Sequence, residues 1–112
     1  MNFGLSETTV TAIRNVLAGH PAVEEAVVFG SRALGREHSR SDVDIALRGQ
    51  LAPLETEGIA LELEELPVPV QFDVLSLEAI RHRGLREHIA RVGKVLYSRQ
   101  PQATATASLP NY

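Results

Sequence analysis

Helical stretches and short β-rich runs alternate along this chain, and their order limits its fold more than any other feature. Apolar residues at helical spacing, bounded by capping residues, glycine or proline, predict helices. The helices are expected at residues 6–18, 53–66 and from 76 to about 92. Ser6 is the expected N-cap of the first helix, and Pro53 suits the first turn of the second. Ser76 is the expected cap of the third, which Gly84 should break or bend.

Four short runs rich in β-branched residues lie between and after these helices. They are expected as strands at residues 26–29, 43–47, 70–75 and 95–97. A polar segment, 30–41, follows the first strand and is typical of a loop with one helical turn. The resulting order predicts an α/β or α+β fold, in which helices pack against one small mixed β-sheet.

The composition is that of an ordinary soluble domain. The chain has 112 residues, 44% hydrophobic and 22% charged, a length that suits one domain with a single core. We expect that domain at 1–99, followed by a flexible or partner-docked tail at 100–112. A formal net charge of −3 argues against broad nucleic-acid binding. No apolar run could cross a bilayer and no secretory signal pattern is present, so we expect no membrane association and a cytoplasmic location.

Aspartate is scarce in this chain. Of 14 acidic residues 11 are Glu, and the three Asp are Asp42, Asp44 and Asp73. Because successive residues of a strand point to opposite faces, Asp42 and Asp44 should project side by side, with Val43 and Ile45 turned into the core. Paired carboxylates repel each other unless a cation lies between them, and Mg²⁺ prefers carboxylate and phosphate oxygens. The Asp-x-Asp pattern therefore predicts a magnesium site.

Two further features suit the same chemistry. Gly30-Ser31 directly follows the first strand, where a glycine allows a sharp turn and a close approach of phosphate to the backbone. Backbone N–H groups and the Ser31 hydroxyl would hold phosphate oxygens there. Asp73 stands in an otherwise apolar strand, where a carboxylate must be paired, bound to metal or placed at an open sheet edge.

Gly30-Ser31, ten intervening residues, Asp42-x-Asp44 and a lone Asp on a later strand together resemble the DNA polymerase β-like nucleotidyltransferase superfamily. The small size is similar to the minimal, MNT-type branch, which is paired with HEPN-domain proteins in toxin–antitoxin modules. The resemblance covers about residues 6–98, including the closing segment Ile89–Tyr97, and shows no departure at the metal-binding positions.

This resemblance implies an enzyme that transfers AMP from ATP to a hydroxyl, that of a tyrosine, on a HEPN-type toxin and so acts as an antitoxin. It implies two Mg²⁺ ions on Asp42, Asp44 and Asp73, with Asp73 also acting as base toward the attacking hydroxyl. The triphosphate is expected on four residues of the loop: Gly30, Ser31, Arg32 and Ser41. Assembly as a homodimer or a hetero-oligomer stays open.

Two other functions stay open beside this one. A non-catalytic antitoxin would neutralise its partner by occupying its surface, with nucleotide chemistry secondary or absent. A small-molecule nucleotidyltransferase would act on an aminoglycoside-like acceptor, although this chain is short for building that pocket without a second copy.

Each of these residues also has a simpler interpretation, as a structural or solvent-exposed residue. Asp42 alone would suit a cap at the start of a strand, Asp73 an exposed strand edge, and Ser31 an N-cap. Loop arginines are more often solvated than bound to phosphate, and this applies to Arg32, Arg36 and Arg40.

Two charged helical faces are interpreted first as solvated surfaces. The basic run from Arg81 to Arg91 has RNA or an acidic partner as its alternative, whereas the acidic face at 55–65 has none. The four histidines lack the spacing of a zinc site, and the chain has no cysteine to assist them.

Overall fold

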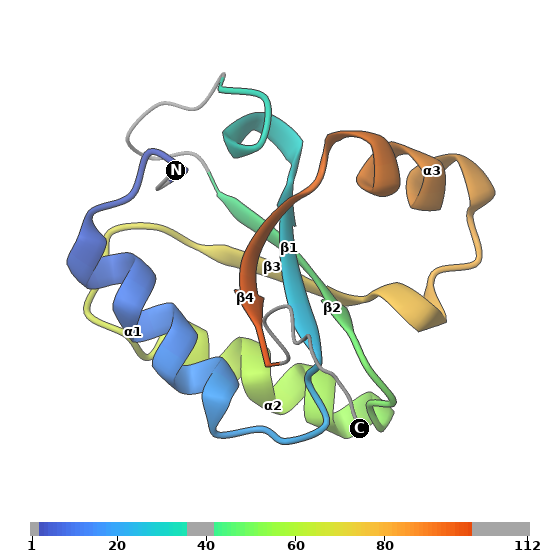
Figure 1. Ribbon diagram of the computed structural model, residues 1–112. Coiled ribbons are helices and arrows are strands. Elements are labelled where there is room, and N and C mark those ends of the chain that lie inside the picture. The colour runs from blue at the N-terminus through green and yellow to red at the C-terminus, as the bar shows by residue number, and fades with distance from the viewer. Residues whose placement is uncertain (1–2, 36–41, 100–112) are drawn as a thin grey trace, which may run out of the picture.

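The computed structural model describes residues 3–35 and 42–99, and it confirms the α/β order expected from the sequence (Figure 1). The elements in chain order are α1 (Glu7–Ala18), β1 (Glu25–Phe29), the 3₁₀ turn η1 (Gly30–Arg32), β2 (Val43–Arg48), α2 (Pro53–Glu64), β3 (Phe72–Ser76), the 3₁₀ turn η2 (Leu77–Ala79), α3 (Arg83–Val92) and β4 (Lys94–Ser98). None of the helices in the described ranges has the length and apolarity needed to cross a membrane.

The four strands form one mixed sheet in the order β3-β2-β1-β4. β1 is antiparallel to both of its neighbours, whereas β2 and β3 run parallel to each other. A parallel pair needs a crossover connection, which α2 supplies here. The predicted mixed sheet is therefore confirmed, with β3 and β4 at its edges.

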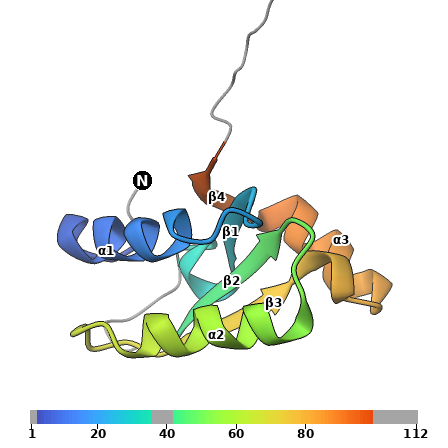
Figure 2. The same ribbon diagram turned by 90° about the horizontal axis from the view of Figure 1, so that it is seen from below.

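The two faces of the sheet are covered by different helices. α1 and α2 pack on one face, and α3 packs on the other (Figures 1 and 2). Alternation along β2 explains the division, because Val43, Ile45 and Leu47 are fully buried in the larger core cluster with α1 and α2. Ala46 lies in the smaller cluster beneath α3, and Asp44 is on that same face of β2.

The first two helices begin as predicted. The Ser6 side chain accepts a hydrogen bond from the Thr9 N–H at 3.1 Å, which satisfies one of the free amides of the first turn of α1. Pro53 opens α2, where its missing N–H leaves no helical hydrogen bond unmade.

The third helical region differs from the prediction. Ser76 makes no capping hydrogen bond, and only the short turn η2 follows it. The cap of α3 is His82, whose Nδ1 accepts a hydrogen bond from the Leu85 N–H at 3.0 Å. Gly84 lies inside the first turn of α3 and does not break the helix. The chain is extended at Ile80 and His82 instead, so the helical region predicted from Ser76 begins only at Arg83.

The acidic face of α2 is exposed as predicted, apart from the half-buried Glu55, but three of its carboxylates also contact other parts of the fold. His20 lies between two of its carboxylates, with Nε2 at 2.9 Å from Glu62 and Nδ1 at 3.7 Å from Glu55. The Phe72 N–H donates a hydrogen bond to Glu64 at 3.0 Å. These contacts hold α2 against the turn that follows α1 and against the start of β3.

We expect Gly58→Ala to stabilise the protein. Gly58 lies inside α2, and a Cβ atom there would meet nothing within 4 Å. Alanine in a helix interior is favoured over glycine by about 0.5–1 kcal/mol, so the free energy of unfolding in urea should rise by that amount.

Gly93→Ala is the matched control, and it should destabilise the protein by about 1–3 kcal/mol, as overpacked positions do. Its Cβ would collide with the Val27 side chain and the Ile89 carbonyl oxygen. A fall in stability for Gly58→Ala would mean that the outer side of α2 is not open.

Candidate active site

The carboxylates expected to act together lie on neighbouring strands. Asp44 of β2 is paired with Asp73 of β3 in the parallel ladder and with Phe29 of β1 in the antiparallel ladder. Adjacent strands lie about 4.8 Å apart, so this register brings Asp44 and Asp73 side by side. Asp44 is half-buried and Asp73 is exposed on the edge strand, while Asp42 is exposed just before β2 begins.

The turn after β1 lies directly against this pair. Gly30 has a φ of +78°, and a Cβ atom on it would collide with a carboxylate oxygen of Asp44. The positive φ favours glycine at this position, and a Cβ there would also force the Asp44 carboxylate to turn aside.

Ser31 lies within the turn η1 and is half-buried. The N-cap of this turn is Phe29, and no side chain caps it. The interpretation of Ser31 as an N-cap is therefore wrong, which leaves its hydroxyl available for the predicted phosphate contact.

Charge and burial both act on Asp44. Burial raises the pKa of Asp44, and the carboxylates of Asp73 and Asp42 raise it further. In residues 3–35 and 42–99, however, no three His, Cys, Asp or Glu side chains are gathered closely enough to hold a metal ion by themselves. Mg²⁺ typically takes one or two carboxylates and completes its shell with substrate phosphates, so these oxygens fit a metal that arrives with a triphosphate.

Comparison with known proteins agrees with this geometry. The family profile described as Polymerase beta, Nucleotidyltransferase matches residues 11–102. The chain belongs to this nucleotidyltransferase family. No curated protein sequence matches it.

Three solved structures resemble this nucleotidyltransferase. A toxin–antitoxin crystallised with AMP-PNP has 26% sequence identity and a TM-score of 0.65, over 86% of this chain and 76% of that one. A complex of the tri-AMPylated Shewanella oneidensis HEPN toxin with MNT antitoxin has 22% identity and a TM-score of 0.63, over 86% and 75%. A nucleotidyltransferase structure from Sulfolobus solfataricus has 19% identity and a TM-score of 0.51, over 85% and 87%.

Arg32 of the nucleotidyltransferase is not the solvated loop arginine that we expected. Its side chain is buried, with 2% exposed, and Nη1 donates a hydrogen bond to the Phe3 carbonyl at 2.9 Å. Phe3 and Leu5 are buried too, so the segment before α1 packs close to the turn η1. The sequence carried no signal for this contact, and the predicted contact of Arg32 with the triphosphate stays a prediction.

Ser41, a predicted triphosphate ligand, lies outside the described residues. The same is true of the two loop arginines interpreted as solvated, Arg36 and Arg40. The tail predicted at 100–112 lies outside them as well.

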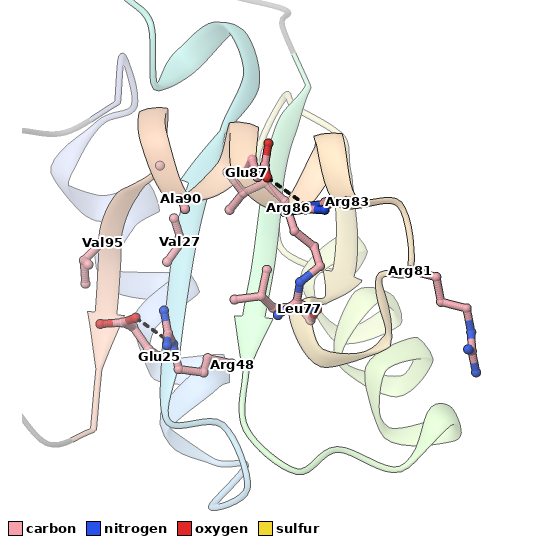
Figure 3. Close-up of a pocket in the computed structure, with 12 residues that line it drawn as sticks. Glu25, Val27, Arg48, Leu77, Arg81, Arg83, Arg86, Glu87, Ala90 and Val95 are labelled. Carbon is pink, nitrogen blue, oxygen red and sulfur yellow. Dashed lines mark hydrogen bonds and ion pairs between the residues drawn. The ribbon is translucent and has the colours of Figure 1, made fainter.

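A pocket of about 640 Å³ opens beneath α3 at the other end of the sheet (Figure 3). Its floor includes the Glu25–Arg48 pair, which lies four residues along β1 from the Phe29–Asp44 pair, or about 13 Å. No aspartate lines this pocket, so it is separate from the predicted triphosphate site.

Several residues of the predicted basic run line this pocket. Arg83 pairs with Glu87 at 3.2 Å, and Arg86 donates to the Leu77 carbonyl at 2.7 Å. Both arginine residues are exposed, as predicted, but Arg86 also holds the turn η2 in place.

We expect Asp44→Asn to stabilise the ligand-free protein at neutral pH. The pKa of Asp44 is higher in the folded than in the unfolded chain, so the unfolded chain releases this proton at lower pH. The free energy of unfolding therefore falls as the pH rises between the two pKa values, and the asparagine variant avoids this loss.

Melting temperatures measured across the acid range check this expectation. The variant should melt above the parent at neutral pH, and the difference should vanish below about pH 3.9, the usual pKa of an unfolded aspartate. Glu78→Gln, at an exposed carboxylate away from the site, is the control. If the melting temperatures of parent and Asp44→Asn were the same at every pH, the Asp44 carboxylate would not destabilise the folded chain.

We expect Gly30→Ala to destabilise the protein by about 1–3 kcal/mol more than Gly35→Ala. Both glycines have positive φ, +78° and +71°, but only at Gly30 would the new Cβ meet another group, the Asp44 carboxylate. Urea denaturation of the two variants separates the backbone effect from the contact with Asp44.

A double variant isolates that contact. Asp44→Gly removes the carboxylate, so the excess loss should disappear when it is combined with Gly30→Ala. If Gly30→Ala and Gly35→Ala lowered the free energy of unfolding equally, the contact between the turn and Asp44 would have no effect on stability.

Proposed function

We propose that this nucleotidyltransferase transfers AMP from ATP to a hydroxyl of a HEPN-type toxin and thereby acts as its antitoxin. The observation that carries the proposal is the Asp44–Asp73 pair on adjacent parallel strands, with the Gly30 backbone directly against it. The relative crystallised with AMP-PNP supports an adenine nucleotide, and the complex containing a tri-AMPylated HEPN toxin supports the acceptor.

Each residue has a defined task in the proposed reaction. Asp42 and Asp44 would hold the Mg²⁺ that accompanies the triphosphate, and Gly30 and Ser31, with Ser41, would bind its oxygens. Asp73 would complete a second metal site beside the acceptor. When bound, Mg²⁺ would neutralise phosphate charge and lower the pKa of the acceptor hydroxyl.

The bond changes balance without a further reactant. The acceptor oxygen forms a bond to the α-phosphorus of ATP, and the bond from that phosphorus to the bridging β-oxygen breaks. Pyrophosphate leaves with its electron pair, and the hydroxyl proton passes to the Asp73 carboxylate. The edge position and exposure of Asp73 leave it accessible to an acceptor on another protein.

We expect Asp73→Asn to separate binding from chemistry. The variant should keep most of its affinity for Mg·ATP, because Asp42, Asp44 and the turn after β1 remain. It should transfer AMP about 10²–10⁴-fold more slowly, the usual effect of removing a general base. Calorimetry measures the affinity, and intact mass of the partner measures the transfer.

Glu78→Gln serves as the control, since Glu78 is an exposed carboxylate just beyond β3. It should change neither quantity. If Asp73→Asn transferred AMP at the parental rate, Asp73 would have no role in the reaction and would only be an exposed residue of an edge strand.

A non-catalytic antitoxin is the second candidate. It is favoured by the observation that the carboxylates in the described ranges do not already form a three-ligand site. Under this alternative the parent protein neutralises its partner without adding mass to it, in the same assay with ATP and Mg²⁺.

A further inference from the structure

The outer face of α2 carries apolar side chains where a surface helix normally carries polar ones. Leu54 is 78% exposed and Leu61 is 66% exposed, whereas Ile59 and Leu63 of the same helix are fully buried. Residues seven apart share one side of a helix, so the two exposed leucines form a stripe opposite the core. We call Leu54, Gly58 and Leu61 the outer stripe, and Figure 2 shows α2 at the rim of the fold.

Gly58 lies between the two leucines, and no neighbour among residues 3–35 and 42–99 requires a glycine there. A Cβ atom there would meet nothing within 4 Å, and the φ of this residue is that of an ordinary helix. Alanine would stabilise the helix, and the same helix uses one at Ala60. A glycine in such a position allows the backbone of another molecule to approach closely. We call this position without a side chain, between two exposed leucines, the notch.

The charge beside the stripe defines what would fit it. Residues 51–70 contain five glutamates and neither lysine nor arginine. Glu57 and Glu65 flank the stripe and are exposed, and no ion pair is found for either among the described residues. A second copy of this chain would bring the same carboxylates face to face, which disfavours self-association. A partner with lysine or arginine beside an apolar ridge would instead complement both features.

The C-terminal end of α2 lies beside the start of the strand that carries Asp73. Glu64, in the last turn of α2, accepts the hydrogen bond from the Phe72 N–H at 3.0 Å. This bond fixes the end of α2 to the start of β3, one residue before Asp73. Asp73 lies on the sheet face opposite α2, so a partner bound to the outer stripe would have to extend past the end of α2 and around the edge strand β3 to reach it.

We propose that the outer stripe of α2 is the docking surface for the partner protein, and that the occupant is a helix whose apolar ridge is flanked by basic residues. Two helices pack with their axes 8–10 Å apart, and a glycine at the crossing point permits the shorter distance. This inference rests on the proposed function for the identity of the partner. It is independent of whether AMP is transferred.

Calorimetry with the purified HEPN-type toxin of the proposed pair tests the proposal. Leu61→Arg should weaken binding about 30-fold or more, the effect expected when a central apolar contact is replaced by a charge. Val95→Arg is the matched control, because Val95 is 54% exposed on the opposite side of the fold, in the pocket beneath α3. It should leave the dissociation constant within about threefold of the parent, as expected outside a hot spot.

Gly58→Ala gives a readout that a purely structural role would not produce. The variant should be more stable than the parent and yet bind the partner more weakly, because the methyl group fills the notch. Mg·ATP affinity, measured on the same samples, should be unchanged in all three variants.

The outcomes separate this inference from the proposed function. If the parent binds the partner and neither Leu61→Arg nor Gly58→Ala weakens the complex, the docking surface is overturned and the proposed function stands. If Leu61→Arg breaks the complex but the parent adds no AMP, the docking surface stands and the transfer is overturned. If the parent does not bind the HEPN-type protein, both are overturned.

Discussion

The pairing of β2 with β1 on one side and β3 on the other determines where every carboxylate of the site lies. The register aligns Phe29, Asp44 and Asp73 across three strands. A shift of β2 by one residue would turn Asp44 into the core and bring Ile45 to the surface. The full burial of Val43, Ile45 and Leu47 prevents that shift, so the apolar core under α1 and α2 also orients the charged edge on the opposite face.

The same arrangement makes the site destabilise the fold when no ligand is bound. Asp44 is partly withdrawn from water and lies near two other carboxylates, and its raised pKa records both effects. A cation bound together with a triphosphate would offset this repulsion, and any ligand that binds only the folded state stabilises it. Because the carboxylates of the described segments do not form a three-ligand site, nucleotide and metal are expected to bind cooperatively.

Much of the fold and the placement of the central carboxylates could be predicted, because they follow from strong local patterns. The four strands, the first two helices and the mixed sheet follow from periodicity and capping residues, and the inward side chains of β2 from its alternation. The start of α3 could not be predicted, since an imidazole cap at His82 resembles any other exposed histidine in the sequence. The burial of Arg32 depends on Phe3, 29 residues earlier, and no local pattern encodes such a distant contact.

The contact between Gly30 and Asp44 has a consequence for how this family can change over time. Any side chain at position 30 would occupy the space of the Asp44 carboxylate, so the fitness of a substitution at one position depends on the residue at the other. The two positions form an epistatic pair. Once position 44 has lost its carboxylate, a larger residue at 30 meets only the backbone strain of its positive φ, and it then hinders the return of aspartate. A lineage that loses the acid first can therefore become locked into a domain that binds without reacting.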